Sequence, residues 1–334
     1  METIRQTAID AGDVKKLSEK LRSLAATARI ANVPSVVSNV WLGIAMAAST
    51  SGWTADGDLP GVTPALILAG VSLYLAGNFL NDWADRAWDA SHRPERALPR
   101  GLLSPTFYLA VAIASGALGL CLAAAVHLHS LVVALAIGIF ILLYTWIHKR
   151  VTWSVVPMGL CRALLPVLGY VGFVASLDSA PALRDSAITA LCACAFGLFC
   201  HIVGLSLSAR TEAMDRPPSG ILRLARLLFP VAAASVFFAA WQGLSLTPAA
   251  SLGGLLPYGL WIALCLTLFR QPVPVHVSNL LAGIPLVDWI ILLPIALTLA
   301  DSGSGWSPFV TTCFAIPPIA FLAGKALQKL APAT

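Results

Sequence analysis

The chain has 334 residues, of which 58% are hydrophobic and 11% are charged, with a formal net charge of +5. An average soluble domain carries about 25% charged residues, so this chain has too few charges to cover a water-facing surface. The composition therefore excludes a soluble globular enzyme, a disordered chain and a nucleic-acid-binding protein with a basic face. It predicts a polytopic membrane protein in contact with the lipid bilayer.

The first thirty residues carry charges of both signs and lack the apolar core of a signal peptide. Residues 10–29 are predicted to form a short amphipathic helix whose basic side chains rest on anionic headgroups. These basic residues are Lys15, Lys16, Lys20 and Arg22. Because no further linker is evident, we expect a cytoplasmic N-terminal segment, 1–30, followed by a single transmembrane domain, 31–326.

The seven cysteines form no CxxC pair and show no regular spacing. This pattern predicts neither a zinc site nor a disulfide framework. Cys192, Cys194 and Cys200 lie near His201 in the sequence, but the favoured interpretation is that they are small apolar fillers of a membrane helix.

Charge-poor runs predict ten membrane helices, since one span needs about 20 apolar residues. Two runs are long enough for a helical pair, with turns near residues 127–129 and residues 242–243. The Pro-rich stretch 271–287 leaves the count open by one, so the fold class is an all-α bundle of nine or ten spans. The runs are 31–55, 59–81, 101–147 (double), 151–177, 186–209, 227–269 (double), 280–300 and 302–324.

The distribution of Lys and Arg predicts the orientation of these spans. If the spans alternate, 19 of the 21 basic residues fall on the side of the N-terminus, while Arg184 falls on the other side and Arg162 lies within a span. Positive charge is retained on the cytoplasmic side. We therefore expect a multi-pass protein of a bacterial inner membrane, with the N-terminus and the loop after the second span in the cytoplasm.

That loop begins with a one-sided polar stripe. In a helix, Asn78, Asn81, Asp82, Asp85 and Asp89 fall within an arc of about 100°. One Asp at a membrane-helix centre costs about 2.5–3.5 kcal/mol, and neighbouring carboxylates also repel one another. A hard divalent cation removes both penalties, and Mg²⁺ prefers oxygen ligands that it shares with substrate phosphate. The stripe therefore predicts a magnesium site.

Arginines follow the stripe at positions 93, 96 and 100. Their guanidinium groups could bind the phosphate oxygens that a metal leaves uncovered. A solvated loop that obeys the positive-inside rule would also explain these arginines, but it does not explain the one-sided Asn/Asp stripe.

Two segments resemble a known family. The first reads Asn81-Asp82-x-x-Asp85-x-x-x-Asp89, followed by Arg93-Pro94-x-Arg96-x-x-Pro99-x-Gly101, and it resembles the first aspartate-rich motif of the UbiA superfamily of intramembrane prenyltransferases. The second, Tyr144-x-x-x-x-Lys149-Arg150, is similar to the Tyr/Lys-Arg region that follows the family's fourth span. Residues 158–169 resemble, more narrowly, the UbiA-like proteins called EboC.

The resemblance implies a bundle, typically of nine spans, around a central cavity that binds a prenyl diphosphate through Mg²⁺. The prenyl group passes to a small lipophilic, often aromatic, acceptor. The implied metal ligands are Asn81, Asp85 and Asp89, with Asp82 assisting, and the three aspartates are the implied catalytic residues. The implied diphosphate-binding residues are Arg93, Arg96, Lys149 and Arg150, and Asn78, Tyr144 and Arg210 are further candidates for substrate binding. Trp83 and Trp146 could join Tyr144 in stabilising an allylic cation.

The second aspartate-rich motif of the family is degenerate here. Its place, residues 204–216, holds Ser206, Ser208 and Arg210, while the acidic residues Glu212 and Asp215 are wrongly spaced. Arg210 could replace one metal as a fixed positive charge. Three hypotheses follow: a prenyltransferase, a UbiA-derived membrane carrier or exporter of a metabolite precursor, and a non-catalytic membrane subunit. Prenyl transfer is the leading hypothesis.

Two further ionisable residues, Arg162 and Asp288, lie inside predicted spans. Such residues mark a functional path or form a structural ion pair, and the sequence favours neither. A packing role is favoured for His201 over acid–base chemistry, and helix bridging is favoured for Asn39 over ligand contact. Arg29 could equally reach bound phosphate or extend to the headgroups.

Overall fold

The computed structural model describes residues 2–51, 53, 59, 61–177, 185–210, 218–244, 246, 248–301 and 305–331. For residues 2–13, 15, 242–243 and 248, it describes the backbone alone. The described elements are helical, as the sequence predicts. The helices are α1 (Glu2–Thr27), α2 (Val33–Thr50), α3 (Thr63–His92), α4 (Pro105–Val126), α5 (Leu128–Ile147), α6 (Val155–Ala175), α7 (Asp185–Arg210), α8 (Ser219–Phe238), α9 (Pro248–Leu266), α10 (Val273–Ala282), α11 (Ile284–Leu299) and α12 (Pro308–Leu327).

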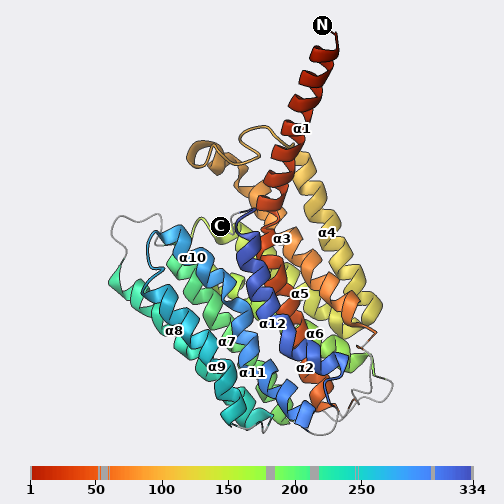
Figure 1. Cartoon of the computed structure of the whole chain (residues 1–334), viewed down its shortest axis with the longest axis vertical. Coiled ribbons are helices and arrows are strands. Elements are labelled where there is room, and N and C mark those ends of the chain that lie inside the picture. Colours follow the sequence, from red (N-terminus) through yellow and green to blue (C-terminus); the bar gives the residue numbers. More distant parts are fainter. Residues whose placement is uncertain are drawn as a thin grey trace.

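Within this described part, ten helical spans are long and apolar enough to cross a membrane. They run roughly parallel, with α8 and α9 at one edge of the view and α4 at the other (Figure 1). The predicted double runs divide where expected. The side chain of His127 caps α5 by accepting a hydrogen bond from the amide of His129, and a π-turn over Ala239–Gly243 ends α8.

The ninth span differs from its predicted bounds of 280–300. It begins at Val273 and runs through α10 and α11 to Leu299, with a break at Gly283. Prolines lie in the first turn of both helices. In that turn the backbone N–H is not needed for a helical hydrogen bond, so proline is tolerated there. The Pro-rich stretch therefore begins α10 and α11 within one span and does not remove a span.

The helices α2 and α11 form the centre of the bundle, where most of their side chains are buried. Close approach between α2 and α6 depends on glycine, since a Cβ at Gly43 would lie 1.9 Å from the Pro166 carbonyl oxygen. A Cβ at Gly169 would lie 2.1 Å from the Val40 carbonyl oxygen. Small residues allow such contacts between membrane helices. These contacts hold the middle of α2 against the second half of α6.

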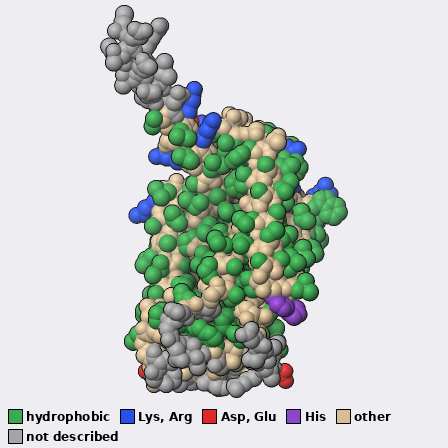
Figure 2. Space-filling model, turned by 90° about the vertical axis from the view of Figure 1, so that its right-hand side faces the viewer, with side chains coloured by type: hydrophobic (Ala, Val, Ile, Leu, Met, Phe, Trp, Pro, Cys, Tyr) green, Lys and Arg blue, Asp and Glu red, His purple; other side chains and the backbone are tan. Residues whose placement is uncertain are grey.

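The outer surface is apolar, as hydrophobic side chains cover most of the face in Figure 2. Exposed side chains such as Ile113, Ile139 and Leu142 belong to the peripheral helices α4 and α5. In this view the Lys and Arg side chains lie in the upper part of the molecule, towards the end from which α1 projects (Figure 2). This segregation matches the asymmetry predicted from the sequence.

The N-terminal helix is longer than the predicted 10–29 and projects beyond the bundle (Figure 1). It is held at its C-terminal part by an ion pair of 2.9 Å between Glu19 and Arg100. A hydrogen bond of 2.8 Å joins the hydroxyls of Thr27 and Tyr108. The predicted contact of its basic face with headgroups stays a prediction, and the Lys15 side chain lies outside the described residues.

Candidate active site

The predicted polar stripe lies on one helix, α3, at the end nearest α1. Asn78, Asn81, Asp85 and Asp89 are buried, with between 2% and 7% of each residue exposed. The carboxylates therefore do not point into bulk solvent. This confirms the predicted placement of the polar side chains on a single helical face, because α3 continues without a break from Thr63 to His92.

Basic side chains from two other segments neutralise this stripe. In the turn after α3, Arg96 Nη1 lies 2.9 Å from Asp89 Oδ2 and 3.4 Å from Asp82 Oδ1. At the end of α5, Lys149 Nζ lies 3.3 Å from Asp85 Oδ2 and 3.6 Å from the centre of the Trp88 ring. Each aspartate of the stripe therefore has a cation on one carboxylate oxygen.

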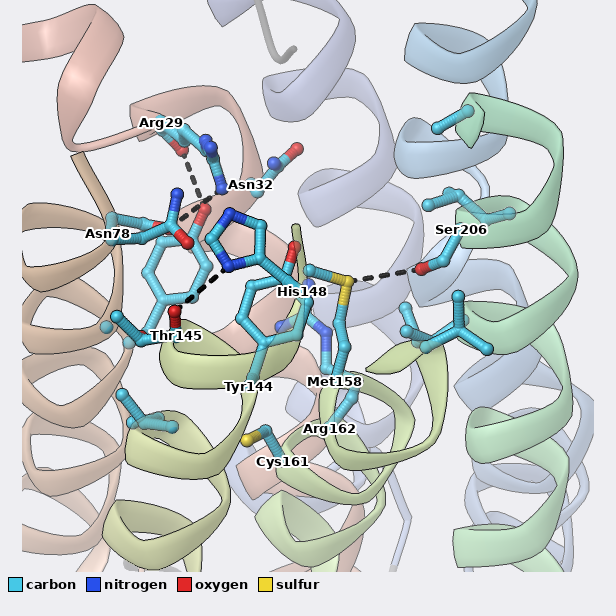
Figure 3. Close-up of a pocket in the computed structure, with 18 of the residues that line it drawn as sticks. Arg29, Asn32, Asn78, Tyr144, Thr145, His148, Met158, Cys161, Arg162 and Ser206 are labelled. Atoms are coloured by element: carbon cyan, nitrogen blue, oxygen red, sulfur yellow. Dashed lines mark hydrogen bonds between the residues drawn. The ribbon is translucent and has the colours of Figure 1, made fainter. Parts of the chain in front are cut away.

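His148 is a site residue that the sequence reasoning missed. Its Nε2 lies 3.0 Å from Asp85 Oδ2, and its Nδ1 lies 3.1 Å from the Thr145 carbonyl oxygen (Figure 3). Both contacts are with oxygen atoms, one of a carboxylate and one of a carbonyl, and they hold the imidazole ring between α3 and the end of α5. The available signal was its position beside Lys149, directly after the same span.

Two oxygens of the stripe have no partner among the described residues. Asn81 Oδ1 and Asp89 Oδ1 are buried without a hydrogen bond. Buried oxygens that lack a donor are costly, and a hard cation would satisfy them. Within the described ranges, no three His, Cys, Asp or Glu side chains converge as a metal cluster. A magnesium ion would therefore use Asn81 and two carboxylates together with phosphate or water oxygens, which is the coordination that Mg²⁺ commonly adopts in proteins.

A cavity of about 460 Å³ opens beside the stripe (Figure 3). Its polar part includes seven of the predicted ligand-binding positions: Asn78, Asn81, Arg93, Arg96, Tyr144, Lys149 and Arg210. Its apolar part includes Ile137, Ile141 and Leu165. The three aspartates are not among the lining residues, whereas Arg96 and Lys149, which pair with them, are. Arg150 does not line it either and is exposed near Trp146.

Asn78 positions Arg29 at the cavity. The Arg29 Nη1 group donates to Asn78 Oδ1 at 3.3 Å, and Asn78 Nδ2 donates to the Ala28 carbonyl at 3.1 Å. Arg29 adopts a left-handed backbone with φ 46°, and its carbonyl accepts from the Tyr74 hydroxyl. Burial opposes the charge of Arg29 more than any other single cause, but the acidic groups around it, of which Asp82 has the strongest effect, together raise the Arg29 pKa above its ordinary value. Arg29 is thus a fixed cation at the cavity wall.

The polar side chains near the C-terminal end of α7 make hydrogen bonds within the protein. Arg210 Nη2 donates to the carbonyls of His148 at 3.0 Å and Val151 at 3.2 Å, and to the Ser154 hydroxyl. The Ser206 hydroxyl donates to the Met158 thioether at 3.1 Å (Figure 3). Glu212 and Asp215 lie outside the described residues.

Arg162 and Asp288 do not form the ion pair that the sequence left open, since no such pair occurs in the described part of the chain. Asp288 accepts from Ser38 Oγ at 2.5 Å and from Asn39 Nδ2 at 2.7 Å. Asn39 thereby bridges α2 and α11, as predicted. His201 has the predicted packing role, with its ring nitrogens 3.1 Å from the Tyr258 hydroxyl and the Leu280 carbonyl.

The sequence profile of the UbiA prenyltransferase family matches residues 36–275. The chain belongs to this family. It is a multi-pass membrane protein whose profile match contains both segments singled out above, the stripe on α3 and the basic end of α5.

Curated relatives match over shorter segments. A digeranylgeranylglyceryl phosphate synthase of Thermococcus sibiricus is 35% identical over 95 residues, which is 28% of this chain and 33% of that protein. A protoheme IX farnesyltransferase of Symbiobacterium thermophilum is 31% identical over 133 residues, or 38% and 44% of the two chains. The chain thus spans less than half of the length of these relatives.

A solved structure of a digeranylgeranylglyceryl phosphate synthase shares the fold. It is 15% identical, with a TM-score of 0.55, over 89% of this chain and 99% of that chain. The helical bundle of this UbiA family member is therefore one already observed in an experimental structure.

Proposed function

We propose that the chain is an intramembrane prenyltransferase that moves an isoprenyl group from a prenyl diphosphate to a small lipophilic or aromatic acceptor. One observation carries the proposal: the buried side-chain oxygens of Asn81, Asp85 and Asp89 lie beside basic side chains that line the polar end of a cavity with an apolar wall. Transfer of a prenyl group requires a site for a highly charged diphosphate and an apolar space for its tail, and this cavity offers both.

In this proposal Asn81, Asp85 and Asp89 hold Mg²⁺, with Asp82 assisting. The ion supplies electrostatic stabilisation of the departing diphosphate. Arg29, Arg93, Arg96 and Lys149 line the same end of the cavity and bind the remaining phosphate oxygens. No side-chain nucleophile is needed, because the acceptor itself attacks the allylic carbon.

The ion pairs of the stripe support a second task for Arg96 and Lys149. Each touches a carboxylate through one group, at 2.9 Å and 3.3 Å, and each also lines the cavity. A small side-chain movement would transfer their positive charge from aspartate to diphosphate. They would thus keep the carboxylates neutralised before substrate enters and bind the leaving group afterwards.

The apolar wall protects the reaction from water. Tyr144 lines the cavity and its ring packs against His148 at 5.0 Å between ring centres. An aromatic face at this position would stabilise positive charge on the allylic carbon. The side chains of Ile137, Ile141 and Leu165 would surround the prenyl tail and exclude water from that carbon.

We further propose that the N-terminus and the stripe lie on the cytoplasmic side of a bacterial inner membrane, since basic side chains gather there (Figure 2). Residues 1–30 would form a separate cytoplasmic segment and 31–326 one transmembrane unit. The resemblance of residues 158–169 to EboC proteins supports a place in that subgroup of the UbiA family.

The test uses the full-length protein in lipid nanodiscs with Mg²⁺, prenyl diphosphates of several lengths and a panel of aromatic acceptors. We expect diphosphate binding that is lost with EDTA and in the double variant Asp85→Ala/Asp89→Ala. The exposed Asp185 at the start of α7 provides the matched control, Asp185→Ala. Mass spectrometry should show a prenylated product. Absence of diphosphate binding would overturn the proposal, and transport of an acceptor across proteoliposomes without product would assign a carrier instead.

A further inference from the structure

A second group of basic side chains lies outside the cavity, around the first turns of α10. Lys325, in the last turn of α12, donates from Nζ to Asn279 Oδ1 at 2.6 Å. Arg226 on α8 and Arg270, which precedes α10, are both close enough to act electrostatically on the ring of His276. Asn279 follows His276 by about one helical turn, so these three cations surround the start of one helix. This helix lies at the end of the bundle from which α1 projects (Figure 1).

The three cations have no carboxylate partner among the residues that the structure describes. After residue 217 the sequence contains two acidic residues, Asp288 and Asp301. Asp288 is fully buried, and Asp301 follows the far end of the span that α10 begins. The ion pairs of the described residues all lie before residue 150. The two halves of the polar end therefore differ, since positive charge is paired beside α3 and unpaired around α10.

Lys325 is held in place between helices. Its ammonium group also donates to Gln328 Oε1 at 3.3 Å, and it lies 5.7 Å from the centre of the Trp261 ring. Gln328 Nε2 donates to the Ser278 carbonyl at 2.7 Å, and Trp261 Nε1 donates to the Asn279 carbonyl at 2.9 Å. The acceptors around the ammonium are neutral amides, so its charge remains available to an anion. The orientation of the spans requires positive charge only in the loops, and it does not explain a lysine fixed among α9, α10 and α12.

Exposed apolar side chains border these cations. Leu227 follows Arg226 on α8, and Leu268 precedes Arg270 by two residues. Leu330, three residues after the end of α12, is exposed as well. A phospholipid carries an anionic phosphate and apolar chains, so it matches both parts of this surface, whereas a soluble anion matches only the cations. Basic pockets between membrane helices bind the headgroups of anionic lipids in this way.

We propose that Arg226, Arg270 and Lys325 bind the headgroup of an anionic phospholipid from the surrounding leaflet. The lipid phosphate would accept a hydrogen bond from Lys325, and the two arginines would supply the remaining positive charge. The acyl chains would lie along Leu227 and Leu268. None of the three cations lines the central cavity, so the inference is independent of the proposed prenyl transfer.

The test compares two phospholipids with the same palmitoyl and oleoyl chains, phosphatidylglycerol and phosphatidylcholine. Native mass spectrometry of the full-length protein in detergent measures the binding of each. We expect phosphatidylglycerol to bind at least tenfold more tightly. This preference should fall at least threefold in Lys325→Met and in the double variant Arg226→Met/Arg270→Met. The matched control is Arg86→Met, which removes an exposed arginine from α3 and should keep the wild-type ratio.

Equal binding of the two lipids by the wild type would overturn the inference. The same follows if Arg86→Met lowers the preference as much as Lys325→Met, because the total charge of the protein would then decide the binding. Displacement of phosphatidylglycerol by inorganic phosphate would assign the cations to a soluble anion, and displacement by Mg²⁺ and pyrophosphate would place the lipid in the central cavity. Arg226 and Arg270 are exposed, so their double variant decides the matter even if Lys325→Met does not fold.

Discussion

The ends of α3 and α7 nearest the N-terminal helix both carry polar side chains beside the same cavity, but the two regions use them in opposite ways. On α3, buried carboxylates pair with basic side chains that also line the cavity, and Asn81 Oδ1 and Asp89 Oδ1 have no partner among the described residues. On α7, the Ser206 hydroxyl and Arg210 Nη2 donate hydrogen bonds to other groups of the protein. The first region is arranged to receive a ligand, and the second is arranged to hold helices together.

The difference lies in what the polar side chains of each region contact. Arg210 joins α7 to the short connection between α5 and α6, which also carries His148. A positive charge in this place could assist a diphosphate through space, but the Nη2 group of Arg210 is already engaged by the protein. We therefore expect the binding of substrate to depend strongly on α3 and weakly on α7.

The largest effect is expected from Asp85→Asn. The variant keeps the shape of the side chain but removes the charge that pairs with His148 and Lys149. Loss of one preorganised electrostatic group lowers turnover by about 100- to 1000-fold in other enzymes, and we expect the same range here. Turnover should be measured as prenylated product formed in nanodiscs with saturating Mg²⁺.

Asp185→Asn is the control for this variant, since Asp185 is an exposed aspartate at the far end of α7. It should retain wild-type turnover. Full activity of Asp85→Asn would show that the stripe on α3 is structural, and the contrast between the two regions would disappear.

The second effect concerns stability. Arg210→Ala removes donors from the His148 and Val151 carbonyls and from the Ser154 hydroxyl. Hydrogen bonds from a charged group contribute roughly 1.5–3 kcal/mol, so the free energy of unfolding should fall by about that amount. Thermal unfolding in detergent measures the change, with Arg223→Ala on the exposed face of α8 as the control.

Pyrophosphate affinity of the folded Arg210→Ala protein should stay close to that of the wild type. A large loss of affinity without a loss of stability would assign Arg210 to the diphosphate, as the sequence predicts, and would make the two regions functionally alike.

A smaller effect is expected from Lys149→Met. The substitution keeps much of the side-chain length over the Trp88 ring but removes the charge near Asp85. If Lys149 transfers its charge to the diphosphate, the KM for the prenyl diphosphate should rise about tenfold, the equivalent of about 1.4 kcal/mol, with a smaller change in kcat. Arg150→Met is the matched control, because Arg150 is exposed and outside the cavity lining. An equal rise in KM for the two variants would mean that Lys149 acts only through the overall positive charge of the loop and makes no specific contact with the diphosphate.

The sequence predicts the α3 stripe well because helical periodicity alone places its members on one face. It predicts the ten spans for a similar reason, since the length of an apolar run is a local property. His148 could not be found in this way, because its contact with Asp85 joins residues 63 positions apart. Such a contact depends on how α3 and α5 pack, and no local pattern in the chain records that packing.

The partners of Arg210 and of the intramembrane charges could not be predicted for the same reason, since they too lie far away in the sequence. The sequence shows that Arg210 follows an apolar span, but the carbonyl groups that it caps belong to the connection between α5 and α6. It also shows that Arg162 and Asp288 are intramembrane ions. Only the fold shows that Asp288 is satisfied by Ser38 and Asn39 while Arg162 is left to face the cavity.

The smallest effect is expected from Ser206→Ala, which tests the α7 region most directly. The Ser206 hydroxyl donates to the thioether of Met158, and sulfur of this kind is a weak acceptor. Loss of that bond should cost less than about 0.5 kcal/mol, below the range of an ordinary hydrogen bond, and turnover should stay within about twofold. If Ser206 instead binds a phosphate oxygen during the reaction, the KM for prenyl diphosphate will rise while the melting temperature stays constant. Ser208→Ala on the same helix serves as the comparison, because the Ser208 hydroxyl donates to the Gly204 carbonyl at 2.9 Å. Steady-state kinetics and thermal unfolding of the same sample therefore distinguish a side chain that packs helices together from one that binds substrate.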